Sequence, residues 1–152
     1  MEQIRNYTGY GWQGQNYQQW LDIKEIAKII RIQLKKDFPE CKFSVSIKRY
    51  SGGQSLYIHL MESPFKISTD PEFKGHYQLN EYMFLEQTEY GIERIFEKWE
   101  ITPQLFYIMQ KVSKFVRSYN YDDSDGMIDY FDTNFYLHLN VGKWDKPYKQ
   151  IN

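Results

Sequence analysis

Residues 43–60 constrain the fold most strongly, because apolar and polar side chains alternate on both sides of a glycine turn. The apolar members are Phe43, Val45, Ile47, Leu56, Ile58 and Leu60. Between the two runs, Gly52 and Gly53 permit the positive φ angles of a tight turn. A period of two places alternate side chains on opposite faces of a strand. The segment is therefore predicted to be an antiparallel hairpin with one apolar face and one polar face.

The segment before the hairpin has the pattern of an amphipathic helix. Asp22 is a favoured N-cap residue, and Pro39 marks the end of the helix. The apolar residues at helical spacing between them are Ile23, Ile26, Ala27, Ile30 and Leu34. A second face carries four cations, Lys24, Lys28, Arg31 and Lys35. This basic stripe could follow the phosphates of a nucleic acid, or it could be an ordinary solvated helix face.

The second half of the chain contains a further helix and a further strand. Thr102 is a good N-cap and Pro103 suits the first helical position, so a helix is predicted from there to about Arg117. A shorter helix is expected at residues 91–98. Apolar and polar residues alternate again over residues 135–141, which predicts a third strand.

These elements predict a single domain of the α+β class, with the order α-β-β-α-β. An antiparallel sheet of about three or more strands should carry the helices packed on one face. Residues 1–20 contain five aromatic residues without a regular period, and are expected to form an arm that docks by its rings. Residues 63–90 are expected to be irregular, with one short element near Tyr82–Leu85.

The composition limits the class of protein. With 41% hydrophobic and 26% charged residues, the chain is too apolar for disorder and too charged for a membrane protein. A net charge of -1 gives no general attraction to nucleic acid or to anionic lipid. The single cysteine, Cys41, suits a reducing compartment. We therefore expect a soluble cytoplasmic protein, without a cofactor and without a membrane partner.

The polar face of the predicted sheet is the first candidate site. The residues assigned to partner binding are Lys48, Tyr57, His59, Met61, Tyr136 and His138. Aromatic and polar side chains on an exposed sheet can bind a protein or stack on nucleic-acid bases. The alternative is an ordinary solvent face, or a face covered by the amino-terminal arm. We recognise no phosphate-binding glycine loop, zinc-ligand spacing or serine elbow, so no catalytic residue and no enzymatic activity are expected.

The second candidate site is an acidic loop at residues 120–132. When Gly126 is aligned with the glycine of a calcium loop, Asp123, Asp125 and Asp132 fall on ligand positions. The first ligand position is then Tyr121, which cannot serve, and the last is not the usual glutamate. The alternatives are a metal site at these three aspartates, or a solvated loop whose aspartates accept backbone N–H bonds.

Two motifs resemble the large polyvalent protein-associated domains, in particular the twenty-ninth type. The first is IAKIIRIQLKKDFPECKFSVSIKRYSGGQSLYIHL, and its matching residues are Arg31, Leu34, Pro39, Phe43, Ser44, Val45, Ser51, Gly52, Gly53, Ser55 and Leu56. The second is DGMIDYFD at residues 125–132, where Gly126 and Ile128 depart from the pattern. The resemblance covers roughly residues 22–142.

The resemblance implies a phage or a conjugative element as the source, and it supplies no catalytic residues. We therefore expect a small non-catalytic binder that inhibits a host defence protein of the CRISPR or restriction type. One alternative is a nucleic-acid-binding accessory protein that uses the basic stripe. A weaker alternative is a metal-dependent enzyme that uses the acidic loop.

Overall fold

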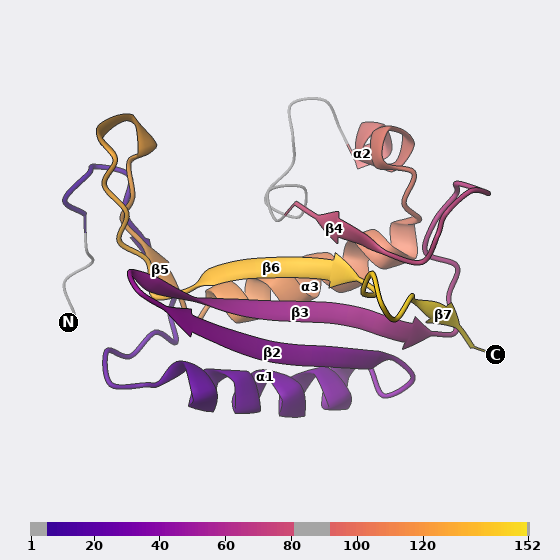
Figure 1. Cartoon of the computed structure of the whole chain (residues 1–152), viewed down its shortest axis with the longest axis horizontal. Coiled ribbons are helices and arrows are strands. Elements are labelled where there is room, and N and C mark those ends of the chain that lie inside the picture. Colours follow the sequence, from indigo (N-terminus) through magenta and orange to yellow (C-terminus); the bar gives the residue numbers. More distant parts are fainter. Residues whose placement is uncertain (1–5, 81–91, 152) are drawn as a thin grey trace.

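The computed structural model of the chain describes residues 6–80 and 92–151 (Figure 1). The helices are α1 (Ile23–Asp37), α2 (Ile92–Trp99) and α3 (Pro103–Arg117). The strands are β1 (Trp12–Gln13), β2 (Lys42–Tyr50), β3 (Gly53–Ser63), β4 (Tyr77–Leu79), β5 (Tyr121–Asp122), β6 (Tyr136–Val141) and β7 (Lys149–Gln150). This content confirms the α+β class.

The predicted starts of the two long helices are confirmed by their N-caps. The Asp22 carboxylate accepts a hydrogen bond from the Lys24 backbone N–H at 3.2 Å. The Thr102 hydroxyl oxygen accepts one from the Leu105 N–H at 3.3 Å, and Pro103 is the first residue of α3. Each cap satisfies a backbone donor that the first turn of a helix leaves without a partner.

The main sheet has the strand order β2-β3-β6-β4, and β7 pairs with the end of β3. The predicted hairpin is confirmed as the antiparallel pair of β2 and β3. The pair of β3 and β6 is parallel, in contrast to the antiparallel sheet expected from the sequence. A parallel neighbour needs a long crossover, which the intervening segment with α3 provides. The edge strand β4 lies in a stretch expected to be irregular, and Tyr82–Leu85 lies outside the described residues.

The register of the sheet separates the apolar and polar side chains as the alternation predicted. Val45 lies opposite Ile58, and Ile58 lies opposite Leu139, so the apolar residues of three strands share one face. Together with α1 and α3 they form one core cluster, whose least exposed members include Ile26, Ile30, Leu56, Ile58, Leu60, Leu105, Met109, Val116 and Val141. Burial of this apolar surface is the main stabilising contribution.

The amino-terminal arm docks through its backbone as well as through its rings. Strand β1 pairs with β5, and beyond it the Gly14 N–H donates to the Asn120 carbonyl at 2.8 Å. Two aromatic contacts add to this attachment. The ring of Tyr7 lies 4.9 Å from that of Tyr130, and the ring of Tyr17 lies 5.0 Å from that of Tyr121. The expectation of docking by rings alone was therefore incomplete.

Candidate binding face

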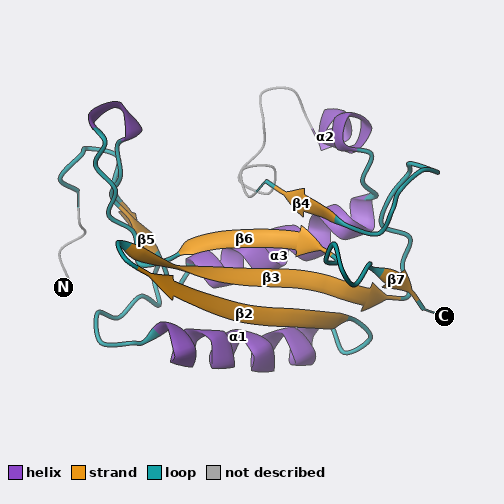
Figure 2. Ribbon diagram, viewed as in Figure 1, coloured by secondary structure: helices purple, strands orange, loops and turns teal. Residues whose placement is uncertain are grey.

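The polar face of the sheet is formed by the side chains that alternate with the core residues. Figure 2 shows the described part of the sheet with no helix across the side turned toward the viewer. Tyr57 lies opposite His138, and His59 lies opposite Asn140, so the register brings these four side chains to one face. We call this surface the polar sheet face. It brings together the predicted residues Tyr57, His59 and His138 from two strands that are distant in the sequence.

The centre of the polar sheet face is ordered by a stack and a short hydrogen-bond chain. The Tyr57 and His138 rings are nearly parallel, with an interplanar angle of 12° and a centroid separation of 4.6 Å. His138 Nε2 lies 3.3 Å from the Ser55 hydroxyl, which lies 2.9 Å from the Tyr50 hydroxyl. Ser55 is buried, and this chain fixes the orientation of the histidine ring, which stacks on Tyr57.

His59 is held by the chain that leaves β6. Its Nδ1 lies 2.9 Å from the Gly142 carbonyl oxygen. A carbonyl can only accept, so Nδ1 carries the proton, and in the neutral ring Nε2 is the acceptor nitrogen. The polar sheet face therefore offers an imidazole acceptor at a fixed position.

A hollow of about 470 Å³ lies at the β4 side of the polar sheet face. Its lining comes from β2, β3, β4, β6 and the turn after β6: Ser46, Tyr57, His59, His76, Tyr77, Gln78, Asn140, Gly142, Lys143, Trp144 and Asp145. Reasoning from the sequence missed His76 and Trp144, because it did not predict β4 or the course of the turn. Trp144 is 83% exposed, and a large aromatic side chain at the surface often marks an interaction site.

Not every residue assigned to partner binding is available at the surface. Lys48 is exposed and Tyr136 is 37% exposed, so both can reach a partner. Met61 is only 5% exposed, and its assignment was wrong. Beyond β6 the chain continues along the carboxy-terminal end of β3. The Gly142 N–H donates to the Leu60 carbonyl, and β7 pairs with Glu62 and Ser63. Alternation placed Met61 on the outward face, but alternation does not determine whether an outward side chain is exposed.

The two histidines of the polar sheet face predict a loss of stability in mild acid. Burial lowers the pKa of His59 and of His138, and at His59 the nearby Lys143 adds to the effect. With a folded pKa below the unfolded value of about 6.5, the unfolded chain takes up protons first as the pH falls. We expect the free energy of unfolding to decrease from pH 7 toward pH 5 in urea titrations.

The variant His138→Phe tests this prediction. It keeps the stacked ring but cannot be protonated, and should reduce the pH dependence of the free energy of unfolding. His76→Gln is the control at an exposed histidine, and an equal reduction there would contradict the assignment.

The basic stripe on α1 is only partly available for a ligand. All four residues of the stripe are exposed, but Arg31 also donates from Nη2 to the Val45 carbonyl oxygen at 2.8 Å. Strand β2 is an edge of the sheet, so Arg31 occupies a carbonyl that would otherwise be open to another strand. Arg31 therefore has a structural role that its spacing in the sequence did not reveal.

The acidic loop is a hairpin whose aspartates accept hydrogen bonds. Asp123 is 2% exposed, and its carboxylate accepts from the Tyr7 N–H, the Thr8 N–H and the Thr8 hydroxyl. Asp125 accepts from the Met127 N–H, and Asp132 accepts from the Tyr121 hydroxyl. Asp123 and Asp125 accept backbone N–H bonds, as the second alternative predicted, but Asp123 is buried and not solvated. Over residues 6–80 and 92–151 no group of three or more potential ligand side chains could hold a metal, so Asp123, Asp125 and Asp132 do not converge as predicted for a metal site.

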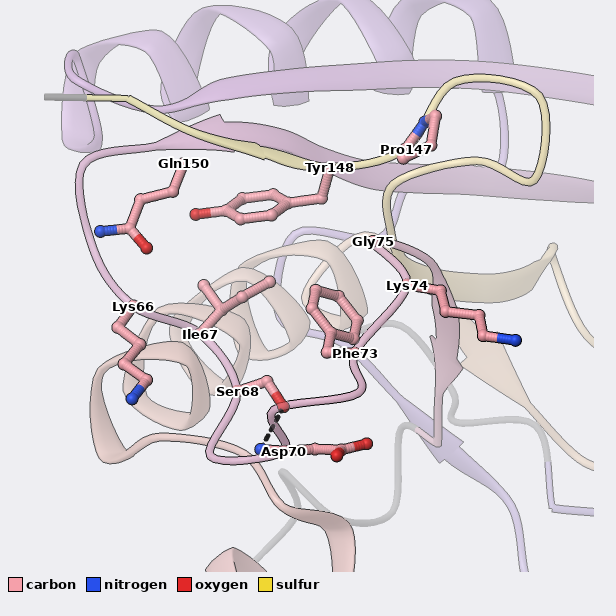
Figure 3. A pocket seen from close by; sticks show the side chains of 10 residues that line it. All are labelled: Lys66, Ile67, Ser68, Asp70, Phe73, Lys74, Gly75, Pro147, Tyr148 and Gln150. Atoms are coloured by element: carbon pink, nitrogen blue, oxygen red, sulfur yellow. Dashed lines mark hydrogen bonds between the residues drawn. The ribbon is translucent and has the colours of Figure 1, made fainter.

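A second hollow, of about 420 Å³, lies between residues 66–75 and the carboxy-terminal segment (Figure 3). Its polar groups serve the local loops. The Ser68 hydroxyl donates to the Glu100 carbonyl and accepts from the Asp70 N–H, while the Asp70 carboxylate accepts from the Glu72 N–H. Lys66 and Lys74 lie on opposite sides of the hollow in Figure 3. The arrangement does not direct several charges to one point, and the polar sheet face remains the stronger candidate.

Comparison with known families decides the affiliation of the chain. A family model described as large polyvalent protein associated domain 29 matches residues 21–109, which is more than half of the 152 residues. The chain belongs to this family. Membership confirms the resemblance of the first motif and suggests an association with phages or mobile elements. The matched range ends before the second motif at residues 125–132, whose resemblance stays a prediction.

Two further comparisons and the helix lengths complete the description. No curated protein and no solved structure matched the chain. In the described residues, no helix has the length and the hydropathy needed to cross a bilayer.

Proposed function

We propose that the chain is a non-catalytic protein-binding module of a phage or mobile element, and that it inhibits a host defence protein of the CRISPR or restriction type. The observation that carries this proposal is the polar sheet face itself. No helix of the described residues crosses it in Figure 2, and it has an ordered Tyr57–His138 stack, an adjoining hollow and the exposed Trp144. Clusters of aromatic side chains with fixed polar groups are typical of the energetically dominant part of protein interfaces.

The ordered stack supports binding rather than catalysis for a physical reason. A ring that is already fixed loses little conformational entropy when a partner covers it. His138 is fixed by Ser55 on one side and Tyr57 by the stack, so the surface is organised before contact. The expected partner therefore presents a flat or convex patch with donors for the His59 acceptor nitrogen.

The double variant Tyr57→Ala with Tyr136→Ala tests this proposal. Each change removes aromatic contact area from the polar sheet face without touching the core cluster. We expect the affinity for the partner to fall by about 2 kcal/mol or more, which is the usual effect at a dominant interface residue. Affinity capture from host lysate, followed by titration of the captured protein, measures the change.

The matched control is Tyr107→Ala on α3, because Tyr107 is an exposed tyrosine away from the polar sheet face. It should leave binding unchanged. Equal binding by the double variant and the parent chain would reject the polar sheet face as the binding site.

The same capture experiment, repeated with nuclease, separates the second candidate function. Nucleic-acid binding is favoured by the three exposed lysines on one face of α1, Lys24, Lys28 and Lys35. Partners that disappear with nuclease would support it, and the affinity should then fall with salt by about one log–log unit per phosphate contact. A stoichiometric protein that survives nuclease supports the protein-binding proposal.

A further inference from the structure

An apolar groove with a positively charged rim lies between α1 and β2. It has a volume of about 330 Å³ and is lined by Arg31, Leu34, Lys35, Pro39, Cys41, Lys42, Phe43 and Val45. Three of these side chains are cationic and none is acidic, although Lys42 also pairs with Glu62 at 3.5 Å. We call this hollow the α1/β2 groove. Its chemistry fits an occupant that combines apolar side chains with negative charge.

The acidic hairpin ends in a surface with this combination. Met127 is 93% exposed, Ile128 is 59% exposed and Phe131 is 61% exposed. Residues 122–132 contain five aspartates and no lysine or arginine; Asp123 is buried, and Asp129 is the one that lies within residues 126–131. We call residues 126–131 the hairpin tip. Apolar side chains grouped at a protruding tip are a frequent mark of an interaction site.

The hairpin tip and the α1/β2 groove lie at opposite ends of the molecule. In Figure 1 the hairpin stands at the end where β6 begins, whereas the groove lies where α1 ends and β2 begins. The tip of one chain therefore cannot reach its own groove. A second copy can present its tip to the groove, and the charges of the two surfaces are complementary.

We propose that the hairpin tip of one copy docks into the α1/β2 groove of another. Met127 and Phe131 supply the apolar contact, and Asp129 lies beside the cations of the rim. Because the two surfaces differ, the contact is heterologous, and each bound copy leaves one tip and one groove for the next. The result is an open head-to-tail chain of copies, and salt weakens it because part of the attraction is between exposed charges.

Sedimentation equilibrium of the whole chain over a wide concentration range tests the proposal. The average mass should rise continuously with protein concentration and fall when salt is added. Lys35→Glu reverses a charge on the groove and should raise the dissociation constant about tenfold or more. Lys36→Glu is the matched control, since Lys36 is exposed on the same helix and does not line the groove. A monomer at every concentration would overturn the proposal, and so would an equal effect of the two substitutions.

A mixing experiment identifies the two surfaces directly. A tip variant, Met127→Lys with Phe131→Lys, keeps an intact groove, and Lys35→Glu keeps an intact tip. Each should associate much more weakly alone than the parent chain does, whereas their mixture should form a 1:1 pair that grows no further. Tyr107→Lys is the control for adding a lysine at an exposed ring. Self-association that survives in the tip variant overturns the proposal. A monomeric chain whose tip instead binds a different protein also overturns it.

Discussion

Replacing Asp123 with alanine is expected to lower the free energy of unfolding by about 3 kcal/mol, because its buried carboxylate accepts three hydrogen bonds from the amino-terminal arm. The Tyr7 and Thr8 N–H groups would lose a charged acceptor in a partly buried place. The arm should then separate from the hairpin. Urea denaturation measures the first effect, and limited proteolysis at residues 6–13 measures the second.

Asp129→Asn is the matched control for this substitution. Asp129 is exposed at the hairpin tip and has a φ of 53°, a conformation that asparagine adopts readily. The same hairpin thus loses one carboxylate without losing the attachment of the arm. Stability and proteolysis should match those of the parent chain. If Asp123→Ala behaved as Asp129→Asn does, the proposed attachment through Asp123 would be wrong.

The second large effect is expected for Gly142→Ala, at the end of β6. An added Cβ would lie 2.0 Å from the Gly75 carbonyl oxygen and 2.5 Å from the Tyr148 nitrogen, and both are backbone atoms. The φ of Gly142 is also positive, at 61°. The backbone must shift, which disturbs the bonds of Gly142 to Leu60 and His59. We expect a loss of about 4 kcal/mol or more in the free energy of unfolding.

Gly126→Ala provides the comparison, because nothing lies within 4 Å of the added Cβ and the φ of Gly126 is not positive. Its effect should stay within about 0.5 kcal/mol in the same urea titration. Gly142→Ala should also alter the environment of His59, visible as a changed imidazole resonance. A Gly142→Ala protein with parental stability would show that the turn after β6 adapts more easily than its contacts indicate.

Local patterns in the sequence were sufficient for most of the regular structure. Asp22 and Thr102 predicted the two long helices because capping depends only on neighbouring residues. The alternation around Gly52 predicted the hairpin and the shared face of Tyr57 and His59, because a period of two fixes the side of each residue. The α+β class follows from these elements.

The features that the sequence did not predict depend on contacts between distant residues. Met61 follows the outward alternation, yet it is buried, and chain more than eighty residues later pairs with the neighbouring end of β3. Asp123 has the spacing of a metal ligand, yet its carboxylate oxygens accept hydrogen bonds from the amino-terminal arm. Arg31 has the spacing of a phosphate-binding stripe, yet it reaches the edge of β2. Each outcome requires the tertiary fold.

The position of β6 has a consequence for how the protein can be divided and how it folds. The family model covers residues 21–109, but β6 is formed by residues 136–141 and lies between β3 and β4. A fragment restricted to the family segment would therefore lack the strand that joins its own two parts. The sheet can close only after residue 141 has left the ribosome, and pairing across such a separation is slow. The segment that the family model matches and the segment that forms the sheet are thus different lengths of chain.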